Sequence, residues 1–311
     1  MTDRSPGTPP LAGELRHIDV FIGGAGGGNP VPLVADASTL SSQDMQGIAR
    51  TTGHESAFVV APTAAGADWR FRFFVPQHEM EMCGHATVGT LWAMRQWGWW
   101  TSATACIETL SGRVEAEWDE AAQRVWVSQP AVQAWTLAED AARRVEAVLG
   151  LPAASVPVMS NASTSRVKTL VPMVDPAALH ALQPDFAAME ALCGSIDSTG
   201  LYPYVRVGDS PDGEPVIAAR QFPKSSGYPE DAATGIAAAA LWGHLAAIGA
   251  IPVGTVDAPV VCTVRQGEAM GRPSAIVVRA RFDDAAAPAG CWLSGQVAWE
   301  GPGVPIAKET P

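Results

Sequence analysis

Residues 79–92 read EMEMCGHATVGTLW, and the predicted fold is built outward from this stretch. Val88 and Leu91 recur at the spacing of one helical face, so the stretch predicts a turn that leads into an apolar helix. The helix start offers no side-chain cap, which leaves the N–H groups near Gly84 and His85 available to an anion. We therefore expect a negatively charged group of a ligand at this helix start.

The composition is that of an acidic globular protein. The chain has 311 residues, of which 47% are hydrophobic and 17% are charged. This length suffices for two lobes or for one large domain with a substantial core. The 20 Lys and Arg residues against 32 Asp and Glu residues give a net charge of −12. Such a charge argues against nucleic acid or an anionic membrane as a partner, whereas a small anionic ligand can still bind at one helix terminus.

The sequence also predicts where the protein resides and what it does not bind. No segment supplies the roughly 18 continuous apolar residues of a membrane span, and the start MTDRSPGTPP lacks the apolar stretch of a signal peptide. The five cysteines are widely scattered without CxxC spacing, which predicts neither a disulfide framework nor a zinc site. We expect a reduced, cytoplasmic protein without a metal.

Strands predominate in the rest of the chain. Apolar runs and alternating patterns predict strands at 17–22, 31–34, 55–60, 69–75, 105–110, 113–118, 124–128, 167–171, 201–207, 261–264, 275–282 and 293–299. Helices are predicted at 41–51, with a serine N-cap at 41 or 42, at 139–149 and at 238–248. The glycine run 23–28 matches no GxGxxG register and leads into a strand, so we interpret it as a wide turn and not as a nucleotide site.

A second passage repeats the plan of the first. Residues 230–237 read EDAATGIA and lead into another apolar helix. The order GIA and then LW at 235–242 echoes GHA and then LW at 84–92, to within one residue of spacing. The echo predicts an internal repeat of two lobes, each with a glycine-led helix start.

Several short motifs along the chain, taken in order, carry a family likeness. They are VF at 20–21 with GNP at 28–30, ESAF at 55–58, RFFVP at 72–76 with Glu79, CGHAT at 83–87, EDAATG at 230–235 and, more weakly, SGQV at 294–297. In this order they resemble the PhzF (phenazine-biosynthesis-like) family, whose fold is that of diaminopimelate epimerase. The resemblance spans nearly the whole chain, from Arg16 to Gly301.

The resemblance implies an α+β fold of two pseudo-symmetric lobes. Each lobe is expected to be a curved, mostly antiparallel sheet wrapped around a central helix. The expected divisions are a flexible tail at 1–14, an N-terminal lobe at 15–130 joined by 291–311, and a C-terminal lobe at 131–290. The active-site cleft would lie between the lobes, where the two helix starts converge, and the family likeness also implies a homodimer.

The family likeness further implies a proton-transfer enzyme. Family members of known activity shift a proton between carbons without a cofactor, so the resemblance implies Glu55 as the acid/base, His85 and Asp231 as residues that bind and orient the substrate, and Asn29 nearby. A carboxylate partly desolvated in an apolar cleft has a raised pKa, which lets one group both remove and return the proton. We expect a cofactor-independent isomerase of a small unsaturated, cyclic amino or carboxylic acid in the biosynthesis of antibiotics or other secondary metabolites.

The two helix starts supply the expected substrate contacts. N–H groups around Gly84 and Gly235 would bind a substrate carboxylate and stabilise the negative charge that develops in the transition state. Thr234 is expected beside them. His54 and Ile236 stand where related sequences often carry serine, and both are expected to line the cleft. They predict a substrate different from the aromatic-precursor acid of phenazine synthesis.

Two alternatives to the isomerase stay open, and the first of them depends on Cys83. Epimerases of this fold use two cysteines, one per lobe, and Cys83 occupies the first position, where a thiol beside a helix N-terminus has a lowered pKa. The second position falls within residues 231–235, which contain no cysteine, so a symmetric two-thiol racemase is disfavoured. The first alternative is an epimerase that uses Cys83 with Glu55 or His54. The second is a protein that binds a small ligand without chemistry.

Overall fold

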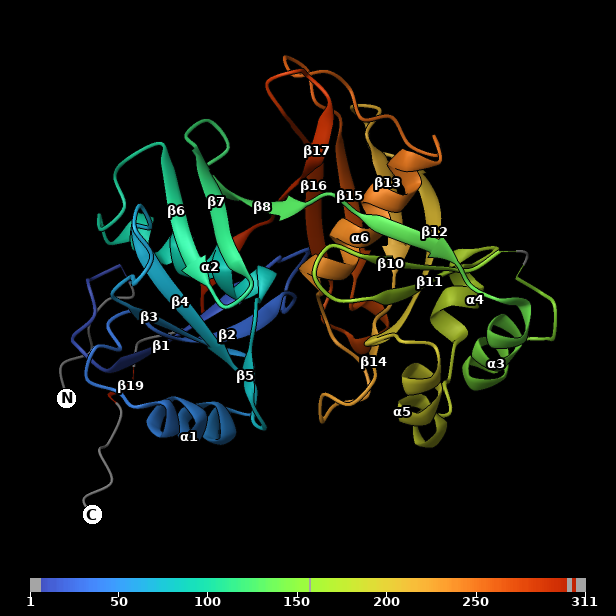
Figure 1. Cartoon of the computed structure of the whole chain (residues 1–311), viewed down its shortest axis with the longest axis horizontal. Coiled ribbons are helices and arrows are strands. Elements are labelled where there is room, and N and C mark those ends of the chain that lie inside the picture. Colours follow the sequence, from blue (N-terminus) through green and yellow to red (C-terminus); the bar gives the residue numbers. More distant parts are fainter. Residues whose placement is uncertain (1–6, 157, 301–303, 306–311) are drawn as a thin grey trace. The chain divides into compact units, whose positions relative to one another are not determined.

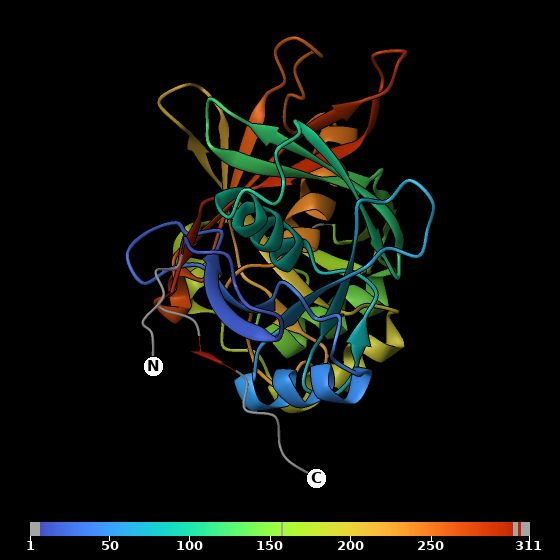
Figure 2. The ribbon, with the colours of Figure 1, turned by 90° about the vertical axis from the view of Figure 1, so that its left-hand side faces the viewer.

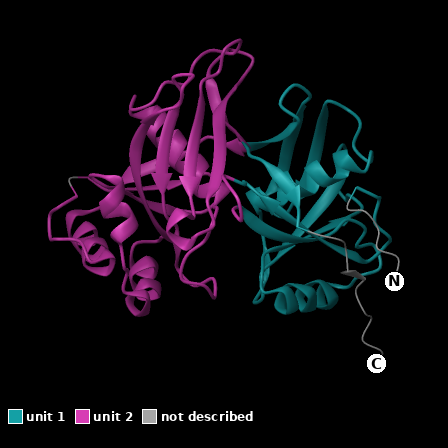
Figure 3. Cartoon of the chain, turned by 180° about the vertical axis from the view of Figure 1, so that it is seen from behind, with its two compact units in different colours: residues 1–22, 28–128, 294–311 teal, residues 23–27, 129–293 magenta. Residues whose placement is uncertain are grey.

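A computed structural model describes residues 7–156, 158–300 and 304–305. Strands outnumber helices along the described chain, which confirms the predicted mixture of the two at the level of fold class (Figure 1). The chain divides into two compact units (Figure 3). Unit 1 comprises residues 1–22, 28–128 and 294–311, and unit 2 comprises residues 23–27 and 129–293.

Part of the predicted domain plan lies beyond the described residues. Residues 1–6 of the predicted tail lie outside them, as do residues 301–303 and 306–311 of the segment expected to join the first lobe. The pseudo-symmetry of the lobes and their predicted boundaries stay predictions. Within the described ranges, no helix is both long and apolar enough to cross a membrane.

Unit 1 is a sheet with one helix packed inside it and one outside. Its elements are β1 (Glu14–Val20), β2 (Asn29–Val34), α1 (Ser42–Thr52), β3 (Ser56–Val60), β4 (Trp69–Phe74), β5 (Glu79–Met80), α2 (Gly84–Gln96), β6 (Thr104–Thr109), β7 (Gly112–Asp119), β8 (Arg124–Pro130), β18 (Val297–Trp299) and β19 (Val304–Pro305). The pairings run β18–β1–β2–β3–β4–β6–β7–β8, where β2–β3 and β4–β6 are parallel and the others antiparallel. The segment β19 also pairs with β1.

Helix α2 is the buried helix of unit 1. It is buried continuously from Gly84 to Leu91, and Figure 2 shows it surrounded by strands. A β-carbon at Gly89 would lie 2.6 Å from both Ile18 Cδ1 and Val20 Cγ2. Because only glycine leaves room for this contact, Gly89 lets strand β1 pack directly on the helix. The glycine at position 89 therefore determines how closely β1 can approach the helix.

Tryptophan side chains attach the C-terminal strand to α2. Trp299 in β18 lies 5.2 Å, between ring centroids, from both Trp92 and Trp97. Aromatic pairs at this spacing add packing energy beyond their buried area. This contact adds to the antiparallel ladder between β18 and β1 in holding residues 297–299 in unit 1.

Helix α1 covers the other side of the sheet, and its N-cap is Ser41, one of the two serines predicted to cap it. The hydroxyl of Ser41 accepts from the Asp44 N–H, and the Asp44 carboxylate accepts from the Ser41 N–H, which completes a capping box. The buried face of the helix packs against Phe58 of β3 and Phe74 of β4. Strand β3 is therefore buried on both faces, and Glu55 immediately precedes it.

Unit 2 also combines a sheet with a buried helix. Its elements are β9 (Gln133–Thr136), α3 (Glu139–Leu149), β10 (Ser160–Ser163), β11 (Lys168–Pro172), α4 (Pro176–Ala181), α5 (Phe186–Ser195), β12 (Gly200–Asp209), β13 (Pro215–Ala219), β14 (Phe222–Pro223), α6 (Gly235–Ala247), β15 (Val261–Gln266), the 3₁₀ turn η1 (Glu268–Met270), β16 (Ser274–Phe282) and β17 (Pro288–Ser294). The pairings run β9–β10–β11–β12–β13–β15–β16, with β11–β12 and β13–β15 parallel, and β14 adds to β12.

Two boundaries in this part of the chain differ from the prediction. Helix α6 begins at Gly235 and not at residue 238, because its first turn is apolar and is buried continuously with the helix as far as Gly243. The single strand predicted at 293–299 is two strands, β17 and β18, because the chain leaves one ladder at Ser294 and enters another at Val297. Helix α3 spans residues 139–149, as predicted.

The glycine run 23–28 is a turn between β1 and β2, as interpreted from the sequence. Residues 23–27 belong to unit 2, where the Gly23 N–H donates to the Pro273 carbonyl at 2.9 Å. A β-carbon at Gly27 would lie 1.8 Å from that same carbonyl oxygen. The glycines thus serve a close approach of two backbone segments.

Candidate active site

Glu55, Cys83 and His85 come together inside unit 1. The Cys83 Sγ lies 3.2 Å from Glu55 Oε2 and 3.3 Å from His85 Nδ1, and His85 Nδ1 lies 3.4 Å from Glu55 Oε2. Cys83 and His85 are each only 3% exposed, whereas the Glu55 side chain is 18% exposed. Each of the three side chains therefore contacts the other two, and solvent reaches the cluster at the Glu55 carboxylate.

The start of α2 places two of these side chains. Cys83 is the N-cap residue in an extended conformation, and its carbonyl accepts from both the Thr87 N–H at 3.0 Å and the Thr87 hydroxyl at 2.8 Å. No side chain caps the helix, as predicted. His85 follows within the first turn, where the positive end of the helix dipole stabilises negative charge on a nearby carboxylate or thiolate.

The triangle has the groups needed for proton exchange. A carboxylate, an imidazole and a thiol at hydrogen-bonding distance can each give or take a proton, depending on their protonation. Only the carboxylate reaches solvent to a substantial degree, so Glu55 is the member best placed to touch a ligand. His85 and Cys83 hold it from the buried side.

Two further predicted residues lie in unit 1. Asn29 is the first residue of β2, is half-buried, and pairs with Val20 of β1. His54 is exposed, and its carbonyl accepts from the Ser56 hydroxyl at 3.1 Å just before β3.

The start of α6 in unit 2 gathers the remaining predicted residues. Thr234 is the N-cap residue, its side chain caps no helix N–H, and its hydroxyl donates to Asp231 Oδ2. Gly235 and Ile236 form the first turn, and both are buried. As at α2, the first N–H groups of a buried helix are without a side-chain cap, which is the arrangement that favours an anion.

A hydrogen-bonded network holds this helix start. Gln266 donates from Nε2 to the Asp231 carbonyl at 2.7 Å and to Thr234 Oγ1 at 3.3 Å. Its Oε1 accepts from the Tyr202 hydroxyl at 2.9 Å and from the Thr234 N–H at 3.3 Å. Complete burial, followed by the charge of Asp231, raises the pKa of Tyr202 well above its usual value, so the phenol stays a neutral donor.

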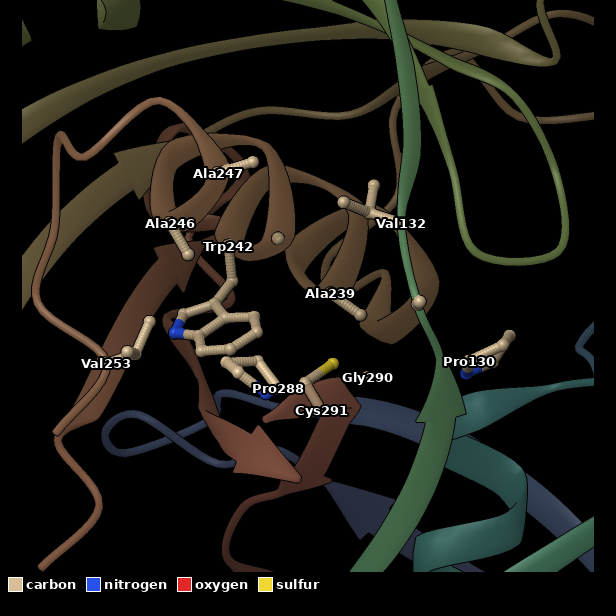
Figure 4. Close-up of a pocket in the computed structure, with 12 residues that line it drawn as sticks. Pro130, Val132, Ala239, Trp242, Ala246, Ala247, Val253, Pro288, Gly290 and Cys291 are labelled. Atoms are coloured by element: carbon tan, nitrogen blue, oxygen red, sulfur yellow. The ribbon is translucent and has the colours of Figure 1, made fainter. Parts of the chain in front are cut away.

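A cavity of about 270 Å³ lies elsewhere in unit 2 (Figure 4). Apolar residues line it, among them Val132, Trp242 and Val253. Its one thiol belongs to Cys291, whose pKa burial raises to about 12, so this cysteine is a poor nucleophile at neutral pH. None of the predicted site residues lines the cavity, and its lining includes no carboxylate or imidazole, so it lacks the acid/base groups that the start of α2 offers.

A profile of the PhzC-PhzF family, described as phenazine biosynthesis-like protein, matches residues 18–299. The chain belongs to this family. The predicted resemblance is thereby confirmed over nearly the full length, including both helix starts.

Two relatives of this PhzF-family chain are named isomerases. An uncharacterized isomerase of Deinococcus radiodurans is 31% identical over 281 residues, covering 87% of each chain. The trans-2,3-dihydro-3-hydroxyanthranilate isomerase of Pseudomonas aeruginosa is 33% identical over 269 residues, covering 85% of this chain and 88% of the relative. These names agree with the predicted enzyme class.

A solved structure supports the fold. The PhzF-family protein of Bacillus anthracis matches with a TM-score of 0.80 at 24% identity, covering 94% of this chain and 99% of the other. The architecture described above is therefore that of a PhzF-family protein.

Sequence reasoning missed the residues that support the start of α6 in this PhzF-family chain. Tyr202 and Gln266 are 64 residues apart, and neither belongs to a motif with local spacing. Strand β13 pairs with β12 on one side and with β15 on the other, and this pairing brings Tyr202 and Gln266 close enough to form a hydrogen bond. No signal in a single sequence marks such a pair.

Proposed function

We propose that the protein is a cofactor-independent isomerase that moves a proton between carbons of a small unsaturated, cyclic amino or carboxylic acid, with Glu55 as the acid/base. The observation that carries the proposal is the triangle of Glu55, Cys83 and His85, in which a partly exposed carboxylate is held by two buried proton-exchanging groups. The name of the Pseudomonas aeruginosa relative supports a substrate of the dihydro-hydroxyanthranilate class.

In the proposed reaction the Glu55 carboxylate removes a proton from one substrate carbon. The electron pair of the broken C–H bond enters the conjugated system, and the double bonds shift. The neutral Glu55 carboxyl then returns the proton to another carbon, which regenerates the carboxylate. His85, with Nδ1 3.4 Å from Glu55 Oε2, orients the carboxylate and can donate to the developing dienolate.

The two uncapped helix starts are the proposed substrate clamps. N–H groups near Gly84 would bind a carboxylate of the substrate, and those near Gly235 would bind a second polar group. Asp231 and Thr234 would orient the substrate from the start of α6. This arrangement requires the proposed cleft between two lobes, into which both helix starts would open.

Three residues are proposed to select the substrate. Asn29, the first residue of β2, would offer the substrate a polar contact beside β1. His54 stands next to Glu55 in sequence. Ile236 adds a buried apolar side chain in the first turn of α6. Together they favour a substrate that differs from the phenazine precursor in at least one polar substituent, in a pathway of secondary metabolism.

The assembly and location of the protein are part of the proposal. A homodimer is the form expected from the family likeness, and the cytoplasm is the location expected from the sequence. The acidic net charge of −12 fits a small-molecule enzyme without a nucleic-acid partner.

One observation favours a second candidate function, stereoinversion at a carbon. Cys83 Sγ lies 3.2 Å from Glu55 Oε2, so thiol and carboxylate can exchange a proton directly. An epimerase needs its base and its acid on opposite faces of the substrate carbon, so Cys83 and Glu55 would have to separate when the substrate binds, and Cys83 with His54 is the alternative pair. The absence of a cysteine from residues 231–235 counts against the symmetric two-thiol form of this chemistry.

The proposed function is tested by a substrate screen in deuterated water. A panel of small unsaturated cyclic amino and carboxylic acids, including trans-2,3-dihydro-3-hydroxyanthranilate, is incubated with the protein and analysed by mass spectrometry and NMR. The proposal predicts a positional isomer that carries solvent deuterium on carbon. A product that differs only in configuration would support the epimerase. A compound that raises the melting temperature without any exchange would identify a binding protein instead.

A further inference from the structure

We propose that Glu55, Cys83 and His85 form a binding site for a divalent metal ion of the zinc class, and that the bound ion blocks proton transfer by Glu55. The inhibition rests on the proposed function, whereas metal binding stands on geometry alone. The three side chains offer one carboxylate oxygen, one sulfur and one imidazole nitrogen, all within 4.8 Å of one another.

The triangle has the dimensions of one face of a zinc tetrahedron. Zinc bonds of about 2.0 to 2.3 Å at tetrahedral angles place neighbouring ligand atoms about 3.3 to 3.6 Å apart. The observed separations are 3.2 Å for Sγ–Oε2, 3.3 Å for Sγ–Nδ1 and 3.4 Å for Nδ1–Oε2. An ion can therefore take up three ligands after shifts of a few tenths of an ångström, with no backbone movement.

The donor set selects the kind of metal. A thiolate and an imidazole suit zinc and related soft or borderline ions, whereas magnesium and calcium require oxygen ligands. Three protein ligands leave a fourth position for water or for a ligand, as in open zinc sites. His85 would bind through Nδ1, the ring nitrogen nearest to both other donors, with its proton on Nε2.

Charge explains why the thiol and the carboxylate are both needed. The positive end of the α2 dipole at Cys83 opposes a cation. Coordination releases the thiol proton to solvent, so the thiolate and the carboxylate together supply two negative charges that neutralise the ion. The exposed part of Glu55 gives the ion a route into a cluster whose other two members are buried. Once bound, the ion draws electron density from the Glu55 carboxylate through Oε2 and so removes the basicity with which Glu55 would take a proton.

The site is tested first by binding, without any substrate. Metal-free protein is titrated with Co²⁺ and with Zn²⁺, using Co²⁺ absorption and calorimetry. We expect one equivalent to bind, with the intense thiolate-to-cobalt band and the visible bands of a tetrahedral site. Mg²⁺ is expected not to compete.

Matched variants locate the ion. Loss of a direct ligand in Cys83→Ala or His85→Gln is expected to weaken binding by more than the roughly 10- to 100-fold typical of residues around the ligands. Cys106→Ser removes a half-buried thiol of the same unit and is expected to bind as the wild type does. No one-to-one binding, or binding unchanged in Cys83→Ala with the fold intact, would overturn the proposal.

Inhibition is read separately from binding. Zn²⁺ should abolish deuterium exchange into substrate at the same concentration at which it binds, and a chelator should restore the exchange. Exchange that persists in the metal-saturated protein would overturn the inhibitory role. Metal binding in a protein that exchanges no proton with any acid of the panel would reject the isomerase and leave the metal site standing.

Discussion

Arg220 and Glu230 form a two-point ion pair inside unit 2. Arg220 donates from Nε to Glu230 Oε1 at 2.9 Å and from Nη2 to Oε2 at 2.7 Å, with each side chain only 9% exposed. Its Nη1 donates to the carbonyls of Leu179 at 3.2 Å and Leu182 at 2.9 Å. One guanidinium therefore ties the end of α4 to the residue that directly precedes Asp231.

Removal of one partner of this pair should destabilise the protein strongly. Glu230→Gln leaves a buried guanidinium without its counter-charge, which typically costs about 3 to 5 kcal/mol of unfolding free energy. The exposed pair of Arg143 and Glu139 on α3 is the control, since Arg143→Ala should cost less than about 1 kcal/mol. Urea unfolding measures both, and equal effects would contradict the role given to Arg220.

The glycine in the middle of α2 gives a prediction with a matched control of opposite sign. Gly89→Ala places a methyl group 2.6 Å from Ile18 and Val20 and should destabilise by about 1 to 3 kcal/mol. Gly47→Ala in α1 meets nothing within 4 Å and should stabilise by roughly 0.5 to 1 kcal/mol. Thermal unfolding of the two variants decides it, and a neutral Gly89→Ala would mean that β1 does not pack as described.

Tyr202 should act through Gln266 on the start of α6. Tyr202→Phe removes the 2.9 Å hydrogen bond to Gln266 Oε1, which should cost about 1 kcal/mol or somewhat more, because the carbonyl keeps only the longer bond from Thr234. If the network positions Asp231 for the substrate, kcat should fall by more than the decrease in the fraction of folded protein explains. A variant with lower stability and unchanged kcat and KM would assign Tyr202 to folding alone.

Cys83→Ala separates the two candidate reactions. In the proposed isomerase the thiol assists Glu55, so we expect exchange to slow by less than about 100-fold, the lower end of the range for a general acid or base. An epimerase that uses the thiol as its base would lose stereoinversion almost completely. The rate of deuterium incorporation, measured beside Cys106→Ser, distinguishes these outcomes.

Elements with a local signal were predictable from the sequence. The serine cap of α1 and the whole of α3 follow from capping residues and periodic apolar positions, which act within a few residues. Helix α5 was missed because its apolar residues follow no helical period, and α4 because it has only six residues. The short polar strand β10 reads SNAS and is a strand only because β9 and β11 pair with it.

The candidate site was predictable to the extent that a motif carries it. CGHAT brings Cys83 and His85 together within three residues, whereas Glu55 lies 28 residues before Cys83 and was assigned through the family likeness. The metal-type geometry of the three groups had no sequence signal, because spacing rules for zinc depend on ligands that are close in sequence. The geometry of the three groups arises because β4 pairs with both β3 and β5, which brings Glu55, directly before β3, near the start of α2.

Glu55→Gln shows whether Glu55 carries the proton between the substrate carbons. The substitution keeps shape and hydrogen bonding but removes the basic carboxylate, and Glu139→Gln on the exposed face of α3 is the control. Both variants are compared with the wild type for deuterium incorporated into substrate carbon, at matched melting temperature. If Glu55 carries the proton, the rate falls by at least about 100-fold in Glu55→Gln and is unchanged in Glu139→Gln. Exchange at the wild-type rate in a folded Glu55→Gln protein would contradict it.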